Sequence, residues 1–139
     1  PETSHASSDI PGTYVWGCEG VGVDGADGTE IGAGLQNTLD IVSGCSDIPI
    51  AASEALSYES NGYSDWYLPS KDELYEMYNT IGNGGPEGNI GRFNNSWGIY
   101  WSSSEFGNSG SAWNVDFIGS GPHFDSKWVA FRVRVIRAF

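Results

Sequence analysis

The chain has 139 residues and carries eighteen Asp and Glu against six Lys and Arg, a formal net charge of −12. This length fits one domain, and the charge argues against an ordinary nucleic-acid binder, because neutralising phosphates requires a net basic face. All six basic residues lie from Lys71 onward, which leaves a small basic patch possible. The aromatic residues, six Trp, seven Tyr and six Phe, provide enough apolar surface for a core.

Polar residues dominate the start of the chain, and we expect residues 1–12 to form a flexible lead-in to one domain over residues 13–139. Because the chain begins with Pro1, we expect it to be a piece of a longer protein. It contains no apolar run of about 18 residues and no charged-then-apolar leader, so neither membrane insertion nor a signal peptide is predicted.

The first elements predicted along the chain are a strand, a loop and two short helices. The strand is expected at Thr13 to Trp16, and residues 17–34 favour a long loop because they are nearly all Gly, Asp, Glu and Val. Apolar residues at helical spacing predict a helix that ends at Gly44, and a second, weaker helix is expected from Ile50 to about Glu59. The apolar positions of the first helix are Leu35, Leu39 and Val42.

The clearest predicted helix follows Ser70. Ser70 and Glu73 form a capping box, in which the two residues satisfy each other's backbone N–H groups, and Gly82 ends the helix. Its apolar stripe consists of Leu74, Met77, Tyr78 and Ile81.

The last third of the sequence favours strands, at Ile99 to Ser103, around Trp113 to Ile118, and at Trp128 to Phe139. In the final strand, alternation predicts that Arg132 and Arg134 lie side by side on the face opposite the core. The predicted core positions of that strand are Val129, Phe131, Val133 and Val135. Helices early and strands late predict an α+β domain.

The two cysteines, Cys18 and Cys45, favour a single disulfide that closes the Gly-rich loop, as in small secreted domains. The alternative is two independent buried thiols. Neither Cys has neighbours with the spacing of a metal site.

Three sequence blocks carry a resemblance to a known family: NGYSDWYLPSKDEL at residues 61–74, YWSSSE at residues 100–105, and RVRVIRAF at residues 132–139. With them the chain resembles the bacterial family named after the C-terminal domain of the Legionella collagen-like adhesin (Lcl). The resemblance covers about residues 13–139.

This resemblance implies a single C-type-lectin-like or formylglycine-generating-enzyme-like domain with short helices, a twisted antiparallel sheet and long loops. It also implies an extracellular adhesion domain on the bacterial surface or secreted, which binds sulfated polysaccharides such as glycosaminoglycans, or host extracellular matrix glycans. A collagen-like stalk would make the domain a homotrimer.

Five basic residues are the candidate ligand contacts, namely Lys71, Arg92, Lys127, Arg132 and Arg134. Arg132 and Arg134 suit a sulfate or carboxylate clamp, because guanidinium groups bind such anions bidentately. The alternative is that they form structural pairs with Asp116 or Glu105 on a neighbouring strand.

A calcium-dependent ligand-binding or structural domain is the alternative function. Asp24, Asp27 and Glu30 lie in a Gly-rich loop whose carbonyl oxygens also suit Ca²⁺, although their spacing is not that of an EF-hand and a solvated acidic loop is the simpler interpretation. Catalysis is not expected, because neither His5 nor His123 accompanies a recognisable nucleophile motif. No cofactor other than Ca²⁺ is suggested.

Trp101, Trp113 and Trp128 are expected mainly in the core, with about one of the three exposed as a platform for a sugar ring.

Overall fold

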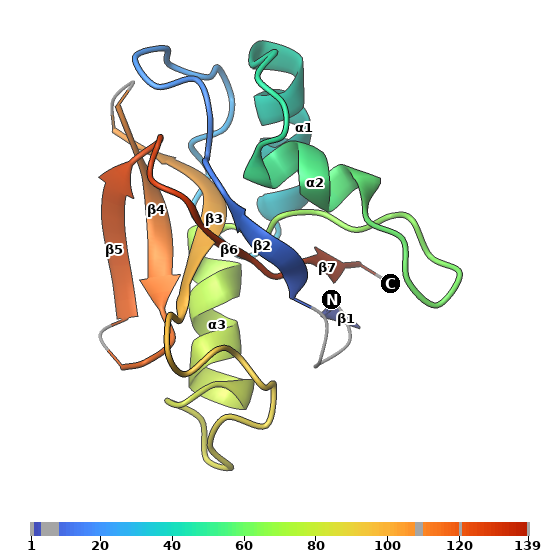
Figure 1. The fold of residues 1–139 in the computed structure, drawn as a ribbon, viewed down its shortest axis with the longest axis vertical. Helices are drawn as coiled ribbons and strands as arrows, with labels where there is room; N and C mark the ends of the chain where they lie inside the picture. Colours follow the sequence, from blue (N-terminus) through green and yellow to red (C-terminus); the bar gives the residue numbers. More distant parts are fainter. Residues whose placement is uncertain (1, 4–8, 108–109, 120, 139) are drawn as a thin grey trace.

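Five strands form one mixed sheet in the computed structural model, which describes residues 2–3, 9–107, 110–119 and 121–138 (Figure 1). The elements in chain order are β1 (Glu2–Thr3), β2 (Ile10–Tyr14), α1 (Gly34–Gly44), α2 (Ala51–Ser57), α3 (Lys71–Ile81), β3 (Ile99–Phe106), β4 (Ser111–Asp116), β5 (Gly121–Ser126), β6 (Phe131–Val133) and β7 (Ile136–Arg137). The predicted α+β class is confirmed. None of the helices in these residues is long and apolar enough to cross a membrane.

The sheet has the strand order β2-β6-β3-β4-β5, and a separate two-stranded sheet pairs β1 with β7. The expected twisted antiparallel sheet is a mixed sheet instead, because β3 and β6 pair in parallel, with Tyr100 opposite Arg132. After the edge strand β5 the chain crosses to the far side of β3 and returns in the same direction as β3 (Figure 1).

Helices pack on the sheet at two places. Helix α3 contacts β3, β4 and β5, whereas α1 contacts β3 and α2 contacts β2 and β6. Two apolar clusters result, one around Trp16 and Trp101 and the other around Tyr100 and Phe117.

The predicted capping box of α3 is confirmed. The Ser70 hydroxyl accepts a hydrogen bond from the Glu73 backbone N–H, and a Glu73 carboxylate oxygen accepts one from the Ser70 backbone N–H. Helix α3 ends at Ile81, directly before the predicted stop at Gly82.

Helix α1 is present where the sequence predicts it, but its predicted core face is exposed. Leu35, Leu39 and Val42 are 43%, 43% and 39% exposed. The opposite face is buried instead, because its polar side chains find partners inside the protein: the Asn37 amide donates to the Gly28 carbonyl. Other buried residues of that face are Thr38 and Ile41.

The predicted long final strand is divided into β6 and β7, and Val129 of its expected core face is 39% exposed. Strand β5, which pairs with β4 along its whole length, occupies a segment for which no strand was predicted. Its Gly, Pro and Asp are residue types that are depleted in strands.

The start of the domain also differs from the prediction. Strand β2 begins at Ile10, and β1 pairs with β7, so parts of the expected lead-in belong to the fold. Of that lead-in, residues 1 and 4–8 lie outside the described residues.

Candidate functional site

Polar side chains from the WYLPSKDEL and YWSSSE blocks hold the long loop that precedes α1. One Glu73 oxygen accepts a hydrogen bond from the Gly32 N–H at 3.0 Å, and the Ser70 hydroxyl donates to the Glu30 carbonyl at 2.8 Å. The Ser104 hydroxyl donates to the Gly28 carbonyl at 2.7 Å. The motif residues therefore stabilise the loop, and Ser70, Glu73 and Ser104 are themselves buried.

Lys127 and Glu105 form a buried ion pair at the other end of the same loop. The Lys127 ammonium lies 2.6 Å from a Glu105 oxygen and donates to the Val21 carbonyl at 2.9 Å. The same Glu105 oxygen accepts a hydrogen bond from the Val23 N–H, and the ammonium also lies over the Trp16 ring. Lys127 is fully buried, so it cannot contact a ligand at the surface as predicted.

Arg134, another predicted ligand contact, is also fully buried. Its Nε donates to Asp9 at 2.6 Å, and its guanidinium lies over the Phe93 ring. Asp9 also accepts a hydrogen bond from the Tyr100 hydroxyl at 2.5 Å. Burial, with the hydrogen bond to Asp9, raises the pKa of Tyr100 above its ordinary value. The predicted side-by-side display of Arg132 and Arg134 is therefore wrong.

Two further basic residues have acidic neighbours. Arg137 makes two hydrogen bonds to Asp65, at 2.8 Å and 3.2 Å, which hold the pKa of Asp65 below its ordinary value. Lys71 lies 3.6 Å from Asp72 and over the Trp113 ring. Both cations therefore already have a counter-charge, and Lys71, one of the predicted ligand contacts, is less free to bind an anion than the sequence suggests.

The remaining cations are Arg92, which lies in the loop that carries Trp97, and Arg132, which donates a hydrogen bond to the backbone of that loop; we call these three residues the Trp97 surface. Trp97 is 59% exposed, and its carbonyl accepts a hydrogen bond from Arg132 Nε at 3.0 Å. Arg92 is exposed in the same loop and adopts a left-handed backbone conformation, φ 55°, which is uncommon for a residue other than glycine. Its carbonyl accepts a hydrogen bond from Arg134, two residues after Arg132, so the loop and the end of β6 are in contact.

Asparagine side chains fix this loop. Asn94 accepts hydrogen bonds from the backbone N–H groups of Ser96 and Trp97, and its own N–H donates to the Tyr100 hydroxyl. Trp97 was not among the candidates from sequence. The available signal was an aromatic residue among the Asn, Ser and Gly of residues 94–98.

The three predicted tryptophans lie in different environments. Trp101 is fully buried and Trp128 is 71% exposed. Trp113 is half-buried and packs against Phe106 and Phe124. Only Trp101 is a core residue, so the expectation that most of the three lie in the core is wrong, whereas the expected exposure of one of them is confirmed by Trp128.

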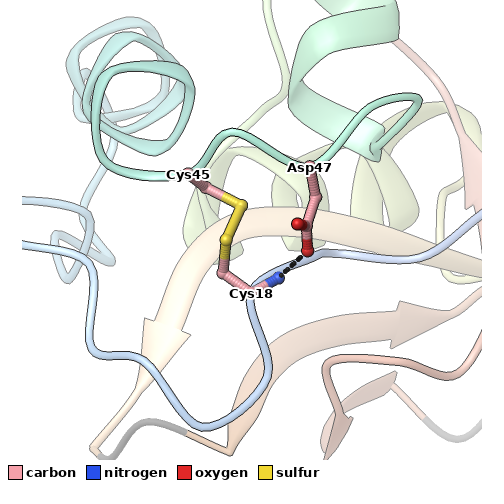
Figure 2. A group of neighbouring side chains, drawn as sticks. All are labelled: Cys18, Cys45 and Asp47. Atoms are coloured by element: carbon pink, nitrogen blue, oxygen red, sulfur yellow. Dashed lines mark hydrogen bonds between the residues drawn. A yellow bond between two sulfur atoms is a disulfide. The ribbon is translucent and has the colours of Figure 1, made fainter.

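The calcium alternative gains no support from the geometry. Asp24, Asp27 and Glu30 are exposed, and their three carboxylates do not form a group in which all lie within 4.8 Å of one another. Among the described residues, the one group with metal-ligand proximity is Cys18, Cys45 and Asp47. Its sulfur atoms are joined as the predicted disulfide, and Asp47 accepts a hydrogen bond from the Cys18 N–H (Figure 2). A disulfide offers no thiolate to a metal.

Comparison with known proteins identifies the family. The model of the Lcl C-terminal domain matches residues 25–137, which include the blocks at residues 61–74 and 100–105 and the Trp97 surface. The chain belongs to the Lcl C-terminal domain family. Membership places this Lcl C-terminal domain among adhesin-related domains of surface or secreted proteins. No curated protein matches the chain.

The buried ion pair predicts a large effect on stability. We expect Glu105→Gln to lower the free energy of unfolding by about 3–5 kcal/mol, because it leaves the Lys127 charge buried without a counter-charge. Combining it with Lys127→Met should restore part of the loss, because no charge is then buried. Urea denaturation measures both, and a loss below about 1 kcal/mol for Glu105→Gln would contradict this role.

Proposed function

We propose that this domain is a non-catalytic adhesion module of an extracellular bacterial protein and that it binds sulfated polysaccharides such as glycosaminoglycans. Membership of the Lcl C-terminal domain family carries the proposal. The disulfide between Cys18 and Cys45 supports an extracellular location, because such bonds persist in oxidising compartments. We also propose that the α+β fold is of the C-type-lectin-like type, with α3 following the WYLPS block as its supporting feature.

The Trp97 surface is the binding site that we propose. Arg92 and Arg132 supply guanidinium groups for sulfates, and the exposed Trp97 ring offers an apolar face for a sugar. Lys71 beside Trp113 is a second, smaller combination of a cation and an aromatic ring.

The net charge of the domain determines the range over which it can attract a polysaccharide. With a net charge of −12, long-range attraction to a polyanion is absent, so binding depends on short-range contacts. A single site is then weak, and several sites on one assembly raise the overall affinity.

We propose a homotrimer as that assembly, in keeping with the collagen-like proteins of this family. The exposed stripe Leu35, Leu39 and Val42 of α1 supports it, because three apolar side chains on one helix face favour contact with another chain.

The binding site is tested with immobilised heparin. Arg92→Ala combined with Arg132→Ala should weaken binding by roughly tenfold or more, because two charge-assisted contacts are lost. The matched control is Arg137→Ala, which should change binding little because Asp65 already holds that guanidinium. Unchanged heparin binding by the folded double variant would contradict the Trp97 surface. A loss on Lys71→Ala instead would move the site to Trp113.

The assembly is tested by sedimentation equilibrium. The domain should have three times the mass of one chain, and Leu35→Ser combined with Leu39→Ser should shift it toward the monomer by removing apolar contact area. Ile48→Ser is the control, because Ile48 is 79% exposed and lies outside α1. A monomeric domain at high concentration would contradict the trimer.

A further inference from the structure

A cavity of about 370 Å³ lies along α3, beside the C-terminal strand β7. Its walls are mainly aliphatic and come from three parts of the chain. They are formed by Ile31, Met77, Ile81 and Ile136. This volume is at the lower end of the range for small-ligand sites, so it suits one extended side chain rather than a polymer.

Two carboxylates accompany this apolar wall, Glu73 and Glu76, one turn apart on α3. Both Glu73 oxygens already accept one backbone N–H, from Ser70 and from Gly32. Each carboxylate oxygen accepts more than one hydrogen bond, so Glu73 keeps acceptor capacity. Glu76 is exposed, and no basic side chain of the described residues lies within 4.0 Å of either carboxylate.

An aliphatic cavity with unneutralised carboxylates selects a ligand that has an alkyl chain and a positive end. A neutral alkyl group packs against the aliphatic wall but leaves the carboxylates without a partner. An anion is repelled by Glu76 and by the net charge of −12. A lysine side chain has both parts, since its methylene stem packs on apolar surface while the ammonium donates up to three hydrogen bonds.

The exposed residues at the opening of the cavity favour a lysine side chain that belongs to another protein. Ile31 is 57% exposed and Glu76 is exposed, so a side chain presented by another protein reaches the cavity without local unfolding. The net charge of −12 also attracts a basic protein surface at long range.

From these observations we propose that the cavity between Ile31, Met77 and Ile136 is a docking site for a lysine side chain of a partner protein, with Glu76 and Glu73 facing its ammonium group. The site is separate from the polysaccharide contacts of the Trp97 surface and does not rest on that proposal.

The chain contains a single methionine, Met77, which provides a selective probe in the wall of the cavity. Protein labelled with ¹³C at the methionine methyl group gives one NMR signal to follow during titration. The ligands are hexylammonium, the peptide acetyl-Gly-Lys-Gly-amide, and the same peptide with norleucine or acetyl-lysine in place of lysine.

We expect hexylammonium and the lysine peptide to shift the Met77 signal saturably. The norleucine and acetyl-lysine peptides should bind with an affinity at least roughly fivefold lower than that of the lysine peptide. Glu76→Gln should weaken the lysine peptide by a similar factor and leave the norleucine peptide unchanged. Glu87→Gln is the charge-matched control, because Glu87 is exposed in the loop after α3 and does not line the cavity.

Several results would overturn the proposal. These are an unmoved Met77 signal, equal binding of the lysine and norleucine peptides, or unchanged binding in Glu76→Gln. Binding of hexylammonium without the lysine peptide would show a site for free amines instead. A Met77 signal that shifts with protein concentration alone would show that a second copy of the chain fills the cavity.

Discussion

Residues 15–33 form neither helix nor strand, and the rest of the structure depends on how this segment is held. A Gly-rich segment of this kind loses much conformational entropy on folding and gains little from its own side chains. The compensation comes from outside it: Glu73 binds the Gly32 N–H at one end, and Glu105 binds the Val23 N–H nearer the disulfide. These acids belong to the WYLPSKDEL and YWSSSE blocks, so both blocks contribute to holding this segment.

Local signals explain which parts of the fold were predictable. The start of α3 was predicted correctly because a capping box involves residues only three positions apart. Helix α1 was predicted at the right place but with the wrong face buried, because the Thr38 hydroxyl oxygen accepts a hydrogen bond from the Leu68 N–H, thirty positions away in the sequence. No periodicity within α1 reveals such a partner, so apolar Leu39 was assigned to the core in place of Thr38.

The basic residues of the candidate site were also predicted incorrectly because their partners are distant in the sequence. Alternation along a strand places Arg132 and Arg134 on one face, but β6 ends at Val133 and the Arg134 side chain is buried against Asp9. Asp9 lies 125 positions earlier, in a segment whose composition indicates a lead-in. The predicted exposure of Lys127 was wrong for the same reason, since its partner Glu105 lies on β3, far away in the sequence. What remained correct was the disulfide, which two cysteines define with few alternatives.

With Lys127 and Arg134 inside the protein, the accessible surface combines a small cationic and aromatic area around Trp97 with a predominantly acidic remainder. This arrangement of the surface requires that the motif acids hold the loop rather than contact the polysaccharide. Amide hydrogen exchange of Gly32 in Glu73→Gln tests that requirement most directly, with Glu76→Gln on the same helix as the control. We expect the Gly32 amide to exchange roughly tenfold faster in Glu73→Gln and at the wild-type rate in Glu76→Gln, because Glu73 and not Glu76 accepts the hydrogen bond from that N–H. Wild-type exchange of Gly32 in Glu73→Gln would contradict it.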